Sequence, residues 1–279
     1  MSFGPLVDVD WLLAHLGSAG LRVVDCRWRL GQPGAGRAAY LDGHIPGAAF
    51  LDLDTDLSDP PGERGRHPLP DTRRFEAAAR AAGIDGGTRV VAYDEAGEGG
   101  AARLWWLLRH FGHEAVAVLD GGAAAWRAAG GALEQGEHQP PGGDFSARER
   151  AGDTASGQEI EESLPSASLR LVDARAPDRY AGRSEPIDPV AGHIPGAVNA
   201  PFSELAPGGR YLPAAELRAR LAHDGDELVA YCGSGVSACT VMLAAELAGL
   251  HARLYPGSWS EWCARGGPAA AVPSLGHSH

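Results

Sequence analysis

The stretch ELVAYCGSGVSACTVMLAAELAG, residues 227–249, decides the fold of this chain. Its apolar run at residues 228–231 is typical of a fully buried strand, and the Ala- and Leu-rich segment that ends at Gly249 is typical of a helix. Cys232 stands between them, at the start of a glycine-rich loop. In open α/β sheets, ligands bind at the carboxyl ends of the strands, and a helix N-terminus favours anions. The sequence therefore predicts that Cys232 reacts as a thiolate at this edge.

Segments of the first half of the chain recur in the second half in the same order. The matching pairs are LRVVDCR at 21–27 with LRLVDAR at 169–175, and GHIPGAAF at 43–50 with GHIPGAVN at 192–199. Apolar runs alternate with helical patterns in both halves, which is typical of βαβ units. The repeat therefore predicts an α/β protein of two tandem domains, each with a parallel sheet flanked by helices.

The two halves differ where the first contains Asp94 and the second Cys232. A carboxylate cannot carry sulfur, so we expect one catalytic domain and one inactive domain that helps to build the cleft. The expected bounds are residues 1–133 for the inactive domain, 134–158 for a linker rich in Pro, Gly and polar residues, and 159–279 for the catalytic domain.

Composition excludes several classes of function. The formal net charge of -12 argues against a nucleic-acid or anionic-membrane partner. The N-terminus has no basic region typical of a signal peptide, and no apolar run reaches the roughly 18 residues that span a bilayer. The four cysteines form no CxxC pair, and no His or Cys pair has metal-ligand spacing. We therefore expect a cytoplasmic protein without a metal or cofactor.

The loop CGSGVSA, the duplicated VD-x-R and GHIPGA segments, the DGG…W and PGS…W pairs, and RLWWLLRHFGH together resemble tandem-domain sulfurtransferases of the rhodanese family. The resemblance covers nearly the whole chain. It implies that Cys232 alternates between thiolate and persulfide, taking sulfane sulfur from a small donor. The implied acceptor is a thiol, cyanide or a thioredoxin-like protein.

The loop after the cysteine indicates the donor. Thiosulfate-type members of the family carry cationic residues there, whereas mercaptopyruvate-type members carry Gly-Ser-Gly-Val-Thr, and this chain has Gly233, Ser234, Gly235, Val236 and Ser237. 3-Mercaptopyruvate is thus the favoured donor, with thiosulfate as the alternative. We expect the loop N–H groups to surround the sulfur. The Ser237 hydroxyl is expected either to assist catalysis beside the thiolate or to cap the helix.

A carboxylate donor needs cations to orient it. Arg179 matches the substrate-binding arginine of the family, but Ile187 occupies the position of the second arginine that mercaptopyruvate enzymes use. Arg183 is a candidate for that second cation, with a solvated surface charge as its alternative. Trp28 matches a family position that lines the pocket.

The sequence also contains candidates for other roles and functions. Both copies of GHIPGA contain a histidine, so a structural role explains His44 and His193 more simply than general-base catalysis, although His44 is a candidate for the cleft. A cysteine phosphatase needs an arginine six residues after the nucleophile, where this chain has Ala238. A nucleotide site built on GEGGAA, residues 97–102, is a weak signal. A persulfide carrier for a protein partner remains an alternative.

Overall fold

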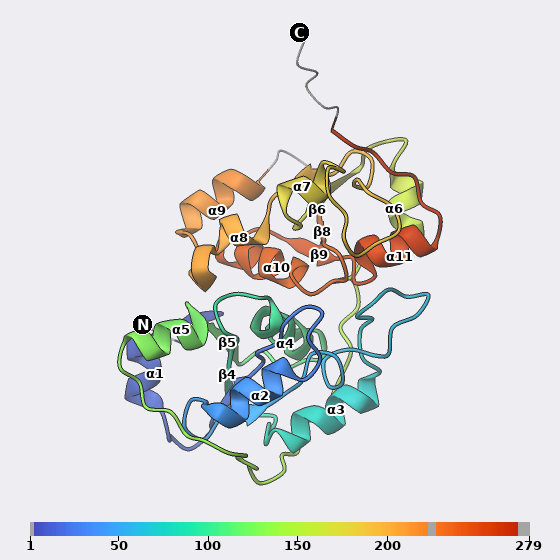
Figure 1. Cartoon of the computed structure of the whole chain (residues 1–279). Coiled ribbons are helices and arrows are strands. Elements are labelled where there is room, and N and C mark those ends of the chain that lie inside the picture. The colour runs from blue at the N-terminus through green and yellow to red at the C-terminus, as the bar shows by residue number, and fades with distance from the viewer. Residues whose placement is uncertain (1–2, 223–226, 273–279) are drawn as a thin grey trace.

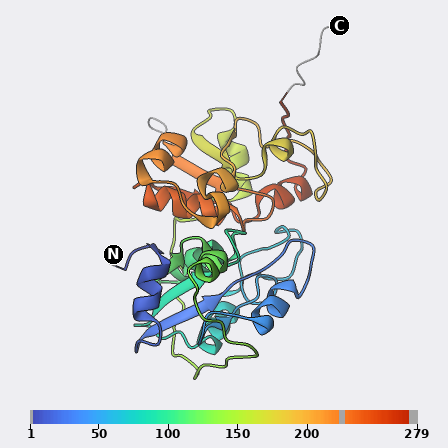
Figure 2. The same ribbon diagram turned by 60° about the vertical axis from the view of Figure 1, so that its left-hand side comes forward.

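The computed structural model describes residues 3–222 and 227–272. The chain forms two α/β domains that lie one against the other, as both ribbon views show (Figures 1 and 2). Within the described residues, no helix has the length and apolar character needed to cross a membrane.

The N-terminal domain is built on a five-stranded parallel sheet with the order β1-β5-β4-β2-β3. Its elements are β1 (Leu6–Val7), α1 (Val9–His15), β2 (Leu21–Asp25), α2 (Ala35–Asp42), β3 (Ala49–Phe50), α3 (Thr72–Ala81), β4 (Arg89–Tyr93), α4 (Gly100–His110), β5 (Val116–Leu119) and α5 (Gly122–Ala128).

The C-terminal domain has a four-stranded parallel sheet with the order β7-β6-β8-β9. Its elements are α6 (Gly157–Ser163), β6 (Leu169–Asp173), α7 (Pro177–Tyr180), β7 (Val198–Asn199), α8 (Phe202–Leu205), the 3₁₀ turn η1 (Pro207–Gly209), α9 (Ala214–Leu221), β8 (Glu227–Tyr231), α10 (Ala238–Leu247), β9 (Ala252–Leu254) and α11 (Ser258–Ala264).

The predicted duplication and its parallel sheets are confirmed. In one sheet Asp25 pairs with Tyr93, and in the other Asp173 pairs with Tyr231, so the central strands have the same register. The strand β1 was not predicted, because two residues are too few to show a period. Its counterpart in the second sheet is a single parallel bridge between Thr154 and Leu254.

The predicted linker is ordered because it is bonded to both domains in turn. Its Phe145 is buried in the first domain, where the N–H of Phe145 donates to the carbonyl of Ile84. Asp153 then accepts a hydrogen bond from the N–H of Leu254 in the second domain. The helix α6 begins at Gly157, inside the range expected for the linker.

The helices α4 and α10 pack against each other at the domain interface, and one hydrophobic cluster includes residues of both. Each helix follows directly on a strand and loop of its own sheet. The N-terminal ends of the helix pair lie together, since a Cβ on Gly99 would contact Ser237. This packing brings the loop of Asp94 against the loop of Cys232, and the site forms beside it.

Candidate active site

Cys232 lies directly after β8, and its side chain is 2% exposed beside a cavity of about 300 Å³ between the domains. The N–H of Gly235 donates to Sγ of Cys232 over 3.1 Å. Gly235 has a φ of +80°, and a Cβ there would lie 2.3 Å from the carbonyl oxygen of Pro256. Only glycine fits this turn, which aims a backbone donor at the sulfur.

The corresponding loop of the N-terminal domain binds a carboxylate where the second domain has sulfur. Asp94 accepts hydrogen bonds from the N–H groups of Gly97 (2.7 Å), Gly99 (3.0 Å) and Ala101 (3.2 Å). Burial first, and the charge of Glu98 second, raise the pKa of Asp94 to about 6. The first loop is therefore already filled by an internal anion.

The other three cysteines are suited to packing rather than to nucleophilic attack. Burial raises the pKa of Cys26 well above its ordinary value, that of Cys239 to about 12 and that of Cys263 to about 11. These thiols stay protonated at neutral pH, and a protonated thiol is a poor nucleophile.

A chain of three polar side chains reaches the cysteine loop from the other domain. Nδ1 of His67 lies 2.7 Å from Oγ of Ser234, and Nε2 of His67 lies 3.2 Å from a carboxylate oxygen of Asp54. The carboxylate can only accept, so Nε2 carries the hydrogen and Nδ1 accepts the hydroxyl of Ser234. Burial, assisted by the charges of Arg103 and Arg66, lowers the pKa of His67 to about 4, so the ring is neutral at pH 7.

Sequence reasoning missed Asp54 and His67, because both lie in the loop between β3 and α3, far from the cysteine in sequence. The nearest signal in the sequence was Trp28, which the structure places in the wall of the cavity. Its Nε1 donates to Asp54 over 3.1 Å, and its ring meets that of His67 edge to face at 5.5 Å.

Arg103 was also missed, because it lies in the apolar pattern of α4. Its side chain is completely buried. The guanidinium donates to the carbonyl of Gly235 (3.1 Å) in one domain and to those of His67 (3.1 Å) and Pro68 (3.3 Å) in the other. One buried cation thus joins the loop of the sulfur to the loop of the imidazole.

Two arginines lie over the cysteine loop. Nη1 and Nη2 of Arg179 lie 3.4 and 3.6 Å, and Nη2 of Arg66 lies 2.8 Å, from the point where a Cβ of Gly233 would be. Both line the cavity, as do Ser234, Val236 and Ser237. Ser237 occupies the N-cap position of α10 without a side-chain capping bond, so its hydroxyl is available to the cavity.

Arg183, the candidate for a second cation, lies elsewhere. Its side chain is 55% exposed and pairs with Asp178, and it does not line the cavity. The reason is local: α7 ends at Tyr180, so the spacing of four residues from Arg179 does not place Arg183 on the same helix face. Arg66 of the N-terminal domain lines the cavity instead.

The paired histidines have structural surroundings. Nδ1 of His44 is 2.9 Å from the carbonyl oxygen of Tyr40, and Nδ1 of His193 is 2.7 Å from that of Tyr180, with each ring stacked on the tyrosine. Neither lines the cavity. His44 therefore does not reach the cleft.

The duplicated aspartates also support the fold. Asp25 accepts from Arg27 and from the hydroxyl of Tyr93, and Asp173 accepts from Arg175. These buried pairs hold the ends of β2 and β6 in the same way.

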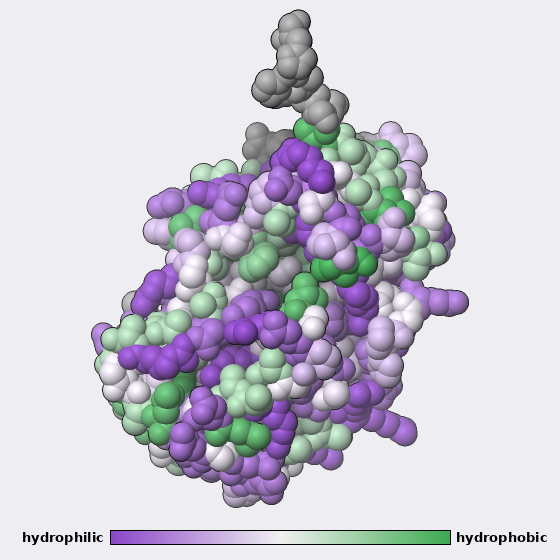
Figure 3. Space-filling view, in the orientation of Figure 1, coloured by the Kyte–Doolittle hydropathy of each residue, from purple (hydrophilic) through white to green (hydrophobic). Residues whose placement is uncertain are grey.

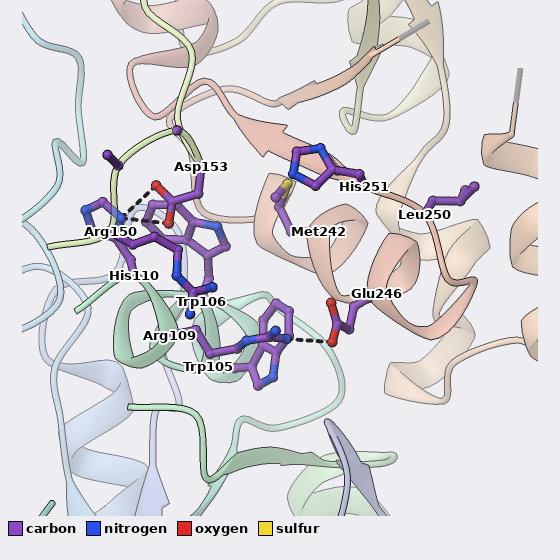
Figure 4. Close-up of a pocket in the computed structure, with 13 residues that line it drawn as sticks. Trp105, Trp106, Arg109, His110, Arg150, Asp153, Met242, Glu246, Leu250 and His251 are labelled. Carbon is purple, nitrogen blue, oxygen red and sulfur yellow. Dashed lines mark hydrogen bonds and ion pairs between the residues drawn. The ribbon is translucent and has the colours of Figure 1, made fainter. Parts of the chain in front are cut away.

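A second cavity, of about 230 Å³, lies at the opposite end of the α4–α10 pair (Figure 4). Two pairs of its polar side chains join the domains: Arg109 contacts Glu246 at 2.9 Å, and His110 contacts Asp153 at 2.9 Å. These contacts help to hold the domains together, and no cysteine or serine among the described residues lines this cavity. In the part of the chain that the structure describes, no cluster of His, Cys, Asp or Glu is placed to hold a metal ion.

Comparisons with known proteins agree with this geometry. The model of the rhodanese-like domain matches residues 8–129 and 156–265. A provisionally named 3-mercaptopyruvate sulfurtransferase of Pseudomonas aeruginosa is 46% identical over 94% of this chain and 96% of its own length. A provisionally named thiosulfate sulfurtransferase of Mycobacterium tuberculosis is 44% identical over 90% and 91%. The crystal structure of SseA from Escherichia coli, titled as a 3-mercaptopyruvate sulfotransferase, has a TM-score of 0.82 and 33% identity over 92% of this chain and 99% of its own.

Proposed function

This chain belongs to the rhodanese family, and we propose that it is a sulfurtransferase that moves sulfane sulfur from 3-mercaptopyruvate to a thiol or cyanide acceptor through a persulfide on Cys232. The observation that carries the proposal is that Cys232, the proposed nucleophile, lies beside groups that can bind an anion. The Gly235 N–H donates to the Cys232 sulfur, and Arg179 lies over the same loop. Such a site suits a sulfur donor that carries a carboxylate.

In the proposed first step, the Cys232 thiolate attacks the sulfur of the donor. An S–S bond forms, the C–S bond breaks, and its electron pair leaves as the enolate of pyruvate. In the second step the acceptor attacks the outer sulfur, the S–S bond breaks, and the Cys232 thiolate returns. The Gly235 N–H stabilises negative charge on the sulfur in both states.

The hydroxyl of Ser234 and the neutral ring of His67 supply the proton transfer. The donor loses its S–H proton, and the enolate carbon needs one. Ser234 lies in the cavity wall and His67 can hold the proton between the two events, with Asp54 stabilising the charged ring. The proton that the donor sulfur loses can therefore be the one that the enolate carbon gains, and no external acid is needed. Ser237 is a second hydroxyl available to the same cavity.

Thiosulfate is the second candidate donor, and one observation favours it. The loop after Cys232 carries no cation, yet Arg66 reaches Gly233 from the other domain. The cavity therefore has the positive charge that a dianionic donor requires.

The test is a comparison of kcat/KM for the two donors, with Cys232→Ser and Cys263→Ser as matched variants. We expect 3-mercaptopyruvate to be preferred, pyruvate to form, and mass spectrometry to find one added sulfur on Cys232. Cys263→Ser should behave as the unmodified protein. A higher kcat/KM for thiosulfate would transfer the assignment to that donor, and activity retained by Cys232→Ser would refute the persulfide.

A cytoplasmic location and a thioredoxin-like acceptor complete the proposal. The described residues include four free cysteines, which a reducing compartment preserves.

A carrier role predicts slow transfer to small thiols but fast transfer to one protein. The face shown in Figure 3 mixes hydrophilic and hydrophobic residues in small patches. Ping-pong kinetics with cyanide or a small thiol would favour the enzyme over the carrier.

A further inference from the structure

The second cation of the donor site is not where the family motif places it. Ile187 occupies that position, its side chain is exposed, and its backbone N–H donates to Glu185. Two other arginines at the cavity are unsuited. Arg175 is committed to Asp173 and to the carbonyl of Gly192, and Arg29 is exposed at the cavity wall.

Arg66 and Arg179 form a pair of guanidinium groups joined by one carboxylate. Nη1 of Arg66 contacts one oxygen of Asp188, and Nη2 of Arg179 donates to the other at 3.1 Å. Glu185 holds the remaining edge of Arg179 through bonds of 2.6 and 3.1 Å. The two cations come from different domains, so mutual repulsion is relieved by the buried carboxylates between them.

Both guanidinium groups keep donors for a ligand. Nη2 of Arg66 and Nη1 of Arg179 face Gly233, and neither makes a hydrogen bond within residues 3–222 and 227–272. Nε of Arg66 is buried and also lacks a partner there. A side chain at Gly233 would strike Arg66, so the glycine after the cysteine makes room for this cation.

The backbone around Arg66 is fixed on the catalytic domain. The N–H of Arg66 donates to Oγ of Ser260 over 3.1 Å. A Cβ on Gly65 would lie 2.8 Å from the carbonyl oxygen of Gly257, so the loop packs without spare room. The next residue, His67, is bonded to Ser234. Arg66 is therefore held in place rather than free to swing in solvent.

We propose that Arg66 is a specificity-determining residue, the second arginine that binds the carboxylate of the donor, supplied by the inactive domain. The inference rests on the proposed function. Arg179 and Arg66 bind the carboxylate between their free N–H groups, above Gly233, and so direct the donor's sulfur at Cys232. Asp188 keeps the pair together when no donor is present.

The experiment uses two alkylating agents that differ in charge, iodoacetate and neutral iodoacetamide. The rate of Cys232 alkylation by each is followed by peptide mass spectrometry in the full-length protein. The variants are Arg66→Met and Arg66→Lys, with Arg179→Met as the positive control. Arg64→Met is the matched control, because Arg64 lies in the same loop with a 68% exposed side chain paired to Asp59.

Loss of one charge-assisted hydrogen bond predicts that the iodoacetate-to-iodoacetamide rate ratio falls by about 10-fold to 100-fold in Arg66→Met and Arg179→Met. Arg66→Lys should lose less, because it keeps the charge without the planar fork. Arg64→Met should leave the ratio unchanged. KM for 3-mercaptopyruvate should rise in the same variants in which the alkylation rate ratio falls.

A ratio that is unchanged in both Arg66 variants overturns the inference, as does an equal fall in the two rates, which would indicate a structural effect. Arg66→Lys keeps the test decisive if Arg66→Met does not fold. Failure of the inference can be distinguished from failure of the proposed function. Wild-type protein that forms no pyruvate would refute the donor assignment, while the alkylation ratio would still report whether Arg66 recognises a carboxylate beside Cys232.

Discussion

Nδ1 of His67 lies 2.7 Å from Oγ of Ser234, although 167 positions of sequence separate the two residues. His67 belongs to the N-terminal domain, and Ser234 belongs to the loop of Cys232 in the C-terminal domain. This contact of the Cys232 loop therefore forms only when the domains are packed together. The N-terminal domain supplies it although its own loop is filled by Asp94.

Replacing His67 with Phe should slow the donor step without disabling the thiol. Phe keeps a ring beside Trp28 but removes both nitrogens that contact Ser234 and Asp54. Loss of a proton-transfer group predicts a fall in kcat with 3-mercaptopyruvate of about 100-fold or more. Alkylation of Cys232 by iodoacetamide should be unchanged. Equal kcat in variant and wild type would show that the relay is not used.

The pH profile gives the same prediction another check. The pKa of His67 is about 4, so its ring stays neutral from pH 5 to pH 8. Any inflection of kcat in that range must then persist in His67→Phe. An inflection that disappears in the variant would mean that His67 titrates there.

The fold, and the place of Cys232 at the end of a strand beside the cavity, could be predicted because the signals were local and repeated. The matched strands that end at Asp25 and Asp173 showed two copies of one sheet. The contrast between Asp94 and Cys232 then distinguished the loop with a carboxylate from the loop with a thiol. Apolar runs, glycines and a repeat are visible in sequence whatever the tertiary packing.

The rest of the site depends on packing between domains, which leaves no periodic signal. His67 and Arg66 lie in an irregular loop and reach the cavity only because that loop is bonded to Ser234 and Ser260 of the other domain. Arg103 lies in a helix that is buried on all sides, so its charge looked like one polar position in an apolar pattern. Sequence spacing alone could not decide between the two roles weighed for Arg183; α7 ends before it, and the structure shows the exposed surface charge.

Arg103 is expected to act as a positioning residue for both loops. Arg103→Met removes the guanidinium that donates to the carbonyls of Gly235 and His67, and leaves that of Gly235 with only the weak thiol donor of Cys239. Leaving a buried carbonyl unsatisfied costs about 1–3 kcal/mol of unfolding free energy. Because both loops shift, kcat/KM should fall alike for 3-mercaptopyruvate and thiosulfate. Arg103→Lys should recover part of the stability.

The distinguishing measurement for Arg103 is the alkylation ratio. A positioning residue predicts that iodoacetate and iodoacetamide slow together, whereas a donor-binding residue changes their ratio. A selective loss of the iodoacetate rate in Arg103→Lys would place Arg103 in the donor site instead. Thermal unfolding of the same samples provides the stability change.

Asp94 predicts a pH-dependent contribution to stability. Its pKa is raised from 3.8 to about 6 in the folded state, by burial and then by Glu98. Between these values the folded state binds more protons than the unfolded state, so this contribution is fully present below the unfolded pKa and is lost as pH rises through about 6. The total is on the order of 3 kcal/mol.

Comparison with Asp94→Asn isolates this effect in urea unfolding at several pH values. The amide does not titrate, so the stability difference should change in favour of the variant as pH rises from about 4 to about 7.5. Glu98→Gln keeps Asp94 but removes the second cause of its shift. The pH at which the stability contribution of Asp94 is lost should then be lower. A difference between Asp94→Asn and wild type that is constant with pH would contradict a raised pKa.

Alanine substitutions at two glycines with positive φ distinguish the effect of backbone strain alone from the effect of losing the N–H group that donates to Cys232. Gly249, at +66°, ends α10 and has no atom within 4 Å of a Cβ placed there. Gly249→Ala should therefore lose about 1–2 kcal/mol from backbone strain alone and keep its activity.

Gly235→Ala has the same kind of strain, and its Cβ meets the carbonyl oxygen of Pro256 at 2.3 Å. The loop must move, which withdraws the N–H that donates to Cys232. We expect a larger fall in melting temperature than for Gly249→Ala and no stable persulfide by mass spectrometry. Persulfide formation at the wild-type rate in Gly235→Ala would show that this N–H is not needed to stabilise the sulfur anion. The N-terminus of α10 would then be the remaining source of that stabilisation.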